Sequence, residues 1–199
     1  MNGSAIVVVS GLPRSGTSMM MRMLEAGGVE LLTDAVRLPD DDNPLGYFEF
    51  ERVKNLPADT GWLEQAEGKA VKVVSALLEQ LPCHRRYKVI FIERDLAEVL
   101  ASQRRMLRRR GRDSDAGSDE RMASLFGKHL AALRTRLASR TDMQVLYVRY
   151  GDVVADPRGA ARRVAEFLER PLQEGAAADA VDASLYRNRM GAEQSRTDA

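Results

Sequence analysis

Near the start of the chain, one arginine and several hydroxyl side chains share a short glycine-containing loop. The loop follows an apolar run and reads Gly11-Leu12-Pro13-Arg14-Ser15-Gly16-Thr17-Ser18. Glycines let the backbone curl so that several N–H groups point inward, and a following helix adds a positive dipole end. The planar fork of Arg14 suits a pair of phosphate or sulfate oxygens. The loop therefore predicts an anion site of the P-loop type.

This loop departs from the form that nucleotide triphosphatases use. Their lysine, which reaches the β- and γ-phosphates, follows the second glycine, and Thr17 stands in that position here. A degenerate P-loop kinase or nucleotide hydrolase is therefore the weaker interpretation, and a non-catalytic nucleotide-binding protein is a further alternative. A glycine-rich turn without a ligand is also disfavoured, because the loop lies between a predicted strand and a predicted helix.

A second cation and a second hydroxyl lie much later in the chain. Arg94 follows the apolar run at 87–92, and Ser102 comes eight residues after it in a predicted helix. The planar guanidinium of Arg94 can bind a phosphate, and the Ser102 hydroxyl can donate a hydrogen bond to that phosphate from the same side. The alternative is that Arg94 pairs with Glu98 on the surface.

Alternating strands and helices must position these groups. Apolar runs predict strands at 6–9, 69–74, 87–92 and 145–149, and helices at 17–26, 76–81, 95–110, 121–140 and 157–169. Asp95 with Glu98, and Asp156 with Pro157, are typical helix starts. Residues 33–61 are predicted to be loops with short helical pieces, and 113–120 a mobile loop.

The order of elements predicts an α/β, P-loop-like three-layer fold. It has a mostly parallel sheet of four to five strands with helices on both faces. We expect a single domain over residues 1–190 and a flexible C-terminal tail at 191–199. Ligands of such sheets bind beyond the carboxyl ends of the strands, so the segments 10–17 and 93–95 should border one crevice.

Composition excludes several other classes. The chain has 199 residues and a formal net charge of +1, which argues against a nucleic-acid binder. One cysteine, Cys83, and two histidines provide neither a disulfide nor a Cys/His metal site, so no metal is expected. No run is long enough for a membrane span and no signal peptide precedes the first strand, which predicts a cytoplasmic protein.

Three segments resemble the sulfotransferases that use 3′-phosphoadenosine-5′-phosphosulfate (PAPS), especially the bacterial and tyrosylprotein-type branch. Residues 13–18 resemble that family's 5′-phosphosulfate loop, and Arg94 with Ser102 resembles its 3′-phosphate site. Residues 150–157, from Tyr150 to Pro157, are similar to its Tyr-Glu-Asp-(x)n-Asp-Pro segment. The matches occur in family order and together extend over roughly residues 5–169.

The resemblance implies an enzyme that moves a sulfuryl group from PAPS to a hydroxyl or amine. The acceptor is an unidentified small molecule or peptide, and the oligomeric state stays open. The cofactor-binding residues that the resemblance implies are Pro13, Arg14, Ser15, Gly16, Thr17, Ser18, Arg94 and Ser102. Whether Arg187 and Arg189 also reach the cofactor, as a late basic motif does in the family, is open.

The resemblance also implies catalytic roles for Arg14, Lys72 and Glu49. Lys72 resembles a strand lysine that contacts the transferring group, with Lys69 as the alternative. Cytosolic relatives place a histidine two residues after that lysine, but this chain has Val74. Other branches use an acidic residue after the P-loop helix. Glu49 is our choice of general base from Asp34, Asp42, Glu49 and Glu51.

Overall fold

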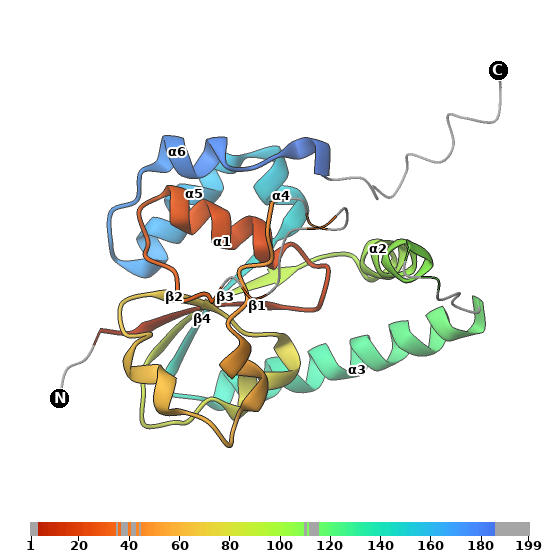
Figure 1. The fold of residues 1–199 in the computed structure, drawn as a ribbon, viewed down its shortest axis with the longest axis horizontal. Helices are drawn as coiled ribbons and strands as arrows, with labels where there is room; N and C mark the ends of the chain where they lie inside the picture. The colour runs from red at the N-terminus through yellow and green to blue at the C-terminus, as the bar shows by residue number, and fades with distance from the viewer. Residues whose placement is uncertain are drawn as a thin grey trace.

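A parallel sheet forms the centre of the molecule. The structure, a computed structural model, describes residues 4–34, 36, 40, 43, 45–109, 111 and 116–185 (Figure 1). Within these residues the sheet has four strands, β1 (Ile6–Gly11), β2 (Ala70–Lys72), β3 (Tyr87–Glu93) and β4 (Met143–Arg149). Their order is β2-β1-β3-β4, and every pairing is parallel. The predicted sheet is therefore confirmed.

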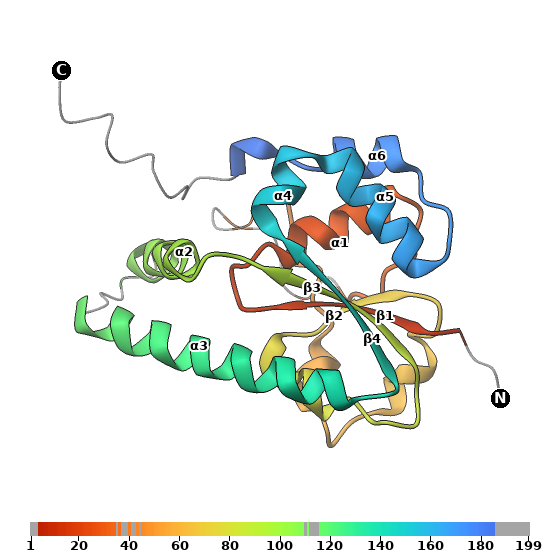
Figure 2. The same cartoon turned by 180° about the vertical axis from the view of Figure 1, so that it is seen from behind.

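Helices cover both faces of this sheet, as Figures 1 and 2 show from opposite sides. One face carries α1 (Thr17–Ala26), α4 (Tyr150–Ala155), α5 (Pro157–Leu168) and α6 (Glu174–Asp179). The other carries α3 (Ala116–Ser139) and the 3₁₀ helices η1 (Glu51–Asn55), η2 (Gly61–Glu64) and η3 (Ser75–Gln80). The helix α2 (Leu96–Arg109) continues from the carboxyl end of β3, and the short η4 (Ala183–Leu185) follows α6. This arrangement confirms the predicted three-layer α/β fold.

Alternation along β1 explains why both faces are covered. Val7 and Val9 belong to the apolar core beneath α1 and α5, while Ile6 and Val8 belong to the core that includes Leu133 of α3. All six residues of β1 are buried. A continuous β-branched run is what a parallel strand covered on both faces requires.

The strands differ from the predicted ranges at their ends. β1 continues past Val9 to Gly11, and β4 begins at Met143 rather than at 145. β2 is shorter than the predicted 69–74. Although the Val73 N–H still donates to the Val9 carbonyl, the chain turns into η3 at Val74.

The helices differ from their predicted ranges more than the strands do. The mobile loop predicted at 113–120 is wrong for 116–120, because α3 begins at Ala116. Asp119, in the first turn of α3, pairs with Arg104 of α2 at 3.0 Å, which favours an ordered start. The helix predicted at 76–81 is the 3₁₀ helix η3. The sequence analysis did not predict α4 or α6.

Both predicted helix caps are present. Asp95 accepts hydrogen bonds from the N–H groups of Ala97 at 2.8 Å and Glu98 at 3.4 Å. Asp156 accepts one from the Gly159 N–H at 2.9 Å, and Pro157 is the first residue of α5. The predicted tail at 191–199 lies outside the described residues, and so do Asp42, Arg187 and Arg189.

Candidate active site

The glycine-containing loop joins β1 to α1 in a strained conformation. Arg14 has a φ of 71° and Gly16 a φ of 105°, both in the left-handed region. A Cβ on Gly16 would lie 2.3 Å from Cδ2 of Tyr150, so the ring and the loop backbone are in direct contact. Glycine at position 16 is therefore required by both the backbone angle and the neighbouring ring.

The two predicted anion-binding motifs meet at this loop. Arg14 Nε donates to Ser102 Oγ at 3.1 Å. Arg94 Nη1 donates to the carbonyl oxygen of Arg14 at 3.2 Å, across 80 residues of sequence. The segments that follow β1 and β3 are therefore in direct contact, as their expected place at one edge of the sheet requires.

Besides its hydrogen bond to the Arg14 carbonyl, Arg94 contacts two other side chains. Its Nε donates to Glu98 Oε2 at 2.9 Å, and the two side chains are only 7% and 6% exposed. Its Cζ lies 4.3 Å from the centre of the Tyr150 ring. Arg94 does pair with Glu98, as the alternative interpretation predicts, but the pair is buried against the loop and not on the surface.

Lys72 projects from the end of β2 toward the start of α1. Its ammonium donates to the Tyr47 carbonyl at 2.7 Å and to Ser18 Oγ at 3.2 Å. The side chain is 10% exposed. Lys69, the alternative, pairs with Glu30 instead and does not share these contacts. The structure thus brings the Lys72 ammonium to Ser18 at the start of α1.

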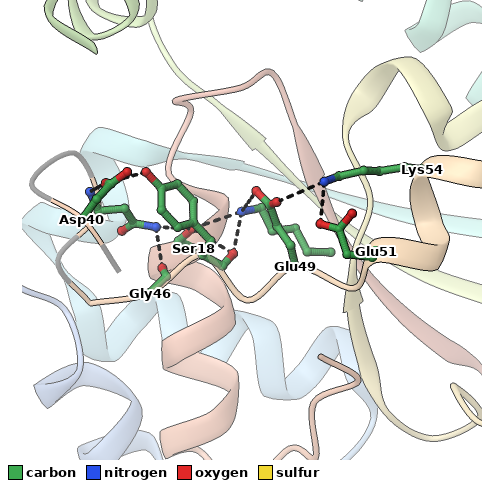
Figure 3. Close-up of polar contacts among 9 residues, drawn as sticks. Ser18, Asp40, Gly46, Glu49, Glu51 and Lys54 are labelled. Atoms are coloured by element: carbon green, nitrogen blue, oxygen red, sulfur yellow. Dashed lines mark hydrogen bonds and ion pairs between the residues drawn. The ribbon is translucent and has the colours of Figure 1, made fainter. Parts of the chain in front are cut away.

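Glu49 lies beside this lysine. Its Oε1 is 3.9 Å from Lys72 Nζ and its Oε2 is 3.9 Å from Lys54 Nζ. Figure 3 shows Glu49 between Ser18 and Lys54. A carboxylate at this place can accept a proton from a group bound beside Lys72.

The other acidic candidates have different neighbours. Asp34 accepts hydrogen bonds from the backbone N–H groups of Glu51 at 2.5 Å and Val36 at 3.2 Å. Its carboxylate therefore ties the chain after α1 to the start of η1. The Glu51 carboxylate pairs with Lys54 at 2.5 Å. Among the acidic candidates within the described residues, Glu49 is the one whose carboxylate pairs with Lys72.

Two site residues were missed by sequence reasoning. Asn43 Nδ2 donates to Ser18 Oγ at 3.0 Å, and Tyr47 provides the carbonyl that Lys72 contacts. The Tyr47 hydroxyl donates to Asp40 at 2.6 Å, which fixes the segment (Figure 3). The contact through Tyr47 could not be predicted, because a backbone carbonyl carries no signal in residue type.

One further arginine, Arg22, lies in α1, the helix that follows the glycine-containing loop. Burial lowers the pKa of the Arg22 guanidinium in α1, while the charges of Asp182 and Tyr150 act to raise it. Arg22 therefore lies close enough to Tyr150 for the two side chains to interact electrostatically.

The comparisons with known proteins agree with this geometry. The sequence profile described as "Sulfotransferase domain" matches residues 5–197. The chain belongs to this sulfotransferase family. No significant match is found among curated protein sequences.

Solved sulfotransferase structures share the fold. Mouse sulfotransferase SULT7A1 complexed with PAP is 18% identical with a TM-score of 0.55, over 92% of this chain and 63% of that one. The sulfotransferase domain of the Synechococcus PCC 7002 olefin synthase is 19% identical with a TM-score of 0.54, over 94% and 80%. The sulfotransferase from Alicyclobacillus acidocaldarius is 14% identical with a TM-score of 0.54, over 83% and 81%. This sulfotransferase-family chain thus spans less than two thirds of the mouse enzyme.

The described residues of this sulfotransferase-family protein contain no group of three or more His, Cys, Asp or Glu side chains placed to hold a metal ion. None of their helices is both long and apolar enough to span a bilayer.

Proposed function

We propose that this protein transfers a sulfuryl group from PAPS to a hydroxyl or amine of an acceptor. The observation that carries this proposal is the contact between the two anion-binding motifs, from Arg94 to the Arg14 carbonyl and from Arg14 to Ser102. A nucleotide with phosphate groups at both its 3′ and 5′ positions needs two neighbouring cationic sites. The mouse relative was solved with PAP, which supports the same ligand class here.

The residues of the loop fit such a ligand. Ser15 Oγ is buried and has no hydrogen-bond partner among the described residues, and an anion held by the loop would give it one. The 5′ end of PAPS would be held by residues 13–18, and its 3′-phosphate by Arg94 and Ser102. Bound PAPS supplies the sulfuryl group and a phosphate as leaving group.

The chain's own groups account for the remaining chemistry. Arg14, the amides of residues 15–18 and the hydroxyls of Thr17 and Ser18 stabilise charge on the leaving oxygen. Lys72 orients the transferring group from the β2 side. Glu49 takes the proton from the acceptor as the sulfur–oxygen bond to the phosphate breaks and the bond to the acceptor forms. The free product is adenosine 3′,5′-bisphosphate.

We propose further that the acceptor is a small molecule or peptide and that the protein acts in the cytoplasm. A single cysteine, Cys83, supports a reducing compartment, because no intramolecular disulfide is needed for the fold.

Transfer of radiolabelled sulfate from PAPS, measured over a panel of alcohols, phenols and amines, tests the function. We expect donor-dependent product, and a loss of about 10²–10³ in rate for Lys72→Ala. Lys69→Ala is the matched control, because Lys69 lies on the same segment and pairs with Glu30. It should change the rate by less than about threefold.

Two results would contradict the proposal. Magnesium-dependent ATP turnover without sulfuryl transfer would favour the degenerate kinase or hydrolase. Tight nucleotide binding with neither transfer nor donor hydrolysis would favour the non-catalytic alternative, which Val74 at the position of the family histidine keeps open.

A further inference from the structure

The exposed apolar side chains of the described residues gather around the end of β2. Four large ones are more than a third exposed, namely Val36, Leu45, Val74 and Leu125. Exposed apolar residues are ordinary when they are scattered, but a group of them beside a functional site marks a binding surface. Three of the four, Leu45, Val74 and Leu125, lie close in the chain to residues that contact Lys72 or the segment directly after it.

Val74 points to the same side of the chain as Lys72. The Val73 N–H donates to the Val9 carbonyl at 3.0 Å, and Val74 has extended backbone angles, so strand geometry continues to this residue. In that geometry, side chains two residues apart point to the same side. Val73, between them, belongs to the core on the α3 face. The exposed Val74 side chain therefore lies about 7 Å further along the chain than the Lys72 side chain, on the same side.

Leu45 belongs to the segment that covers Lys72. The Tyr47 carbonyl, two residues later, accepts the hydrogen bond from the Lys72 ammonium at 2.7 Å. The Asn43 amide, two residues earlier, donates to Ser18 Oγ at 3.0 Å. Leu45 lies between these two anchored residues and is 41% exposed. Its side chain is therefore held at the surface beside the start of α1.

Leu125 comes from α3, which covers the other face of the sheet. His129, one turn later, has Nε2 3.0 Å from Oγ of Ser75, the residue directly after Val74. Residues four apart on a helix share a face, so Leu125 and His129 lie on the same side of α3. Figure 2 shows the first half of α3 extending past the carboxyl ends of the strands, beside α2. Leu125 is therefore carried to the same edge of the sheet as Val74.

The charged groups beside these apolar side chains are paired with one another. Glu49 lies 3.9 Å from both Lys72 and Lys54, and Lys54 contacts Glu51 at 2.5 Å. An anionic acceptor would have to compete with these carboxylates for the two lysines. A sugar would place hydroxyl groups against apolar side chains, where they find no hydrogen-bond partner. An apolar molecule with one hydroxyl meets neither obstacle.

We infer that Leu45, Val74 and Leu125 form an acceptor-binding surface, and that the acceptor is an apolar alcohol with a single hydroxyl on a hydrocarbon body. This inference rests on the proposed function, because the hydroxyl oxygen is the atom that receives the sulfuryl group. The hydrocarbon body covers the three apolar side chains, and the hydroxyl points to Glu49. The oxygen bonds to sulfur as the bond from sulfur to the phosphate oxygen breaks, and Glu49 takes the hydroxyl proton.

Binding of straight-chain alcohols tests this surface without requiring turnover. Calorimetric titrations of 1-butanol, 1-hexanol and 1-octanol into protein saturated with adenosine 3′,5′-bisphosphate give a dissociation constant for each alcohol. We expect this constant to fall by about two- to fourfold for each added methylene, because each methylene leaves water for the apolar surface. Octanoate, which has a chain of the same length but an anionic end, and glucose should each bind at least about tenfold more weakly than 1-octanol.

The double variant Val74→Ser/Leu125→Ser removes two parts of the acceptor-binding surface. Both side chains are exposed, so the variant should be about as stable as the wild type. It should weaken 1-octanol by about tenfold, whereas 1-butanol, which covers less of the surface, should change by less than about threefold. Val36→Ser is the matched control, because Val36 is also exposed but its N–H donates to Asp34. It should leave all three dissociation constants within about twofold.

Two results would overturn the inference while leaving the proposed function intact. One is octanoate or glucose binding as tightly as 1-octanol, and the other is a double variant that keeps the wild-type affinity for 1-octanol. Failure of the proposed function is seen separately, as a wild type that does not bind the bisphosphate at all, and it would remove this inference as well.

Discussion

The ammonium group of Lys72 lies among oxygens from three other parts of the site. They are the Tyr47 carbonyl, the Ser18 hydroxyl and the Glu49 carboxylate. A side chain that is 10% exposed needs such partners, because a buried charge without them is costly. The same partners hold the Lys72 ammonium group in one position. Glu49 lies next to Lys72, where we propose that it takes the proton of a bound acceptor.

At the scale of single residues, Glu49→Gln should lower kcat by about 10²–10⁴, because the amide cannot accept the proton. The KM for PAPS should stay within about twofold, since no cofactor contact is lost. Steady-state kinetics with an accepted substrate measures both values.

Glu51→Gln is the control for this variant, because Glu51 shares the neighbour Lys54 with Glu49. It should leave kcat within about threefold. Equal losses in the two variants, or no loss in Glu49→Gln, would show that Glu49 is not the general base.

Individual residues differ in how well the sequence predicted them. Arg14, Arg94 and Ser102 were recognisable because their motifs fix residue type and spacing, and the structure brings all three together. The contacts of Asn43 and Tyr47 with Ser18 and Lys72 were not, because they depend on how the segment after α1 folds back onto that helix.

At the scale of elements, the start of α1 is the part most constrained by geometry. Its N-cap is Gly16 in the left-handed region, pressed against the Tyr150 ring from the start of α4. The helix α4, which was not predicted, thus contributes a side chain that packs against the glycine-containing loop. Short elements such as α4 carry little periodicity, so tertiary packing decides whether they form.

Gly16→Ala should destabilise the fold by about 1–3 kcal/mol, because alanine strains the backbone and meets the ring. Gly127, inside α3, is the matched control, since nothing lies within 4 Å of a Cβ built there. Gly127→Ala should stabilise by about 0.5–1 kcal/mol, because alanine loses less backbone freedom in a helix.

Urea unfolding of the two glycine variants measures both changes in free energy. A Gly16→Ala protein as stable as the wild type would mean that the ring and the loop are not in contact.

At the scale of the whole molecule, the strand order creates the site. β1 lies between β2 and β3, so the carboxyl end of β1 is flanked by Lys72 on one side and Arg94 on the other. The layered fold followed from the alternation of strands and helices, which the sequence shows clearly. The β2-β1-β3-β4 order did not, because pairing between strands depends on contacts far apart in sequence.

The central claim is that two neighbouring motifs bind opposite ends of one doubly phosphorylated adenosine. Equilibrium titration of adenosine 3′,5′-bisphosphate against ATP tests it most directly, with Arg94→Ala beside the wild type. Because Arg94→Ala leaves Glu98 buried without its partner, the double variant Arg94→Ala/Glu98→Ala serves as a second measurement. Arg134→Ala, which removes an arginine that contacts Glu93 and the Tyr147 ring instead of Arg14, is the control.

We predict that the wild type binds the bisphosphate at least about 100-fold more tightly than ATP, and that both Arg94 variants lose about 10- to 100-fold of that affinity. Arg134→Ala should bind like the wild type. Equal affinity of the wild type for the two nucleotides, or an unchanged preference after Arg94 is removed, would contradict the account.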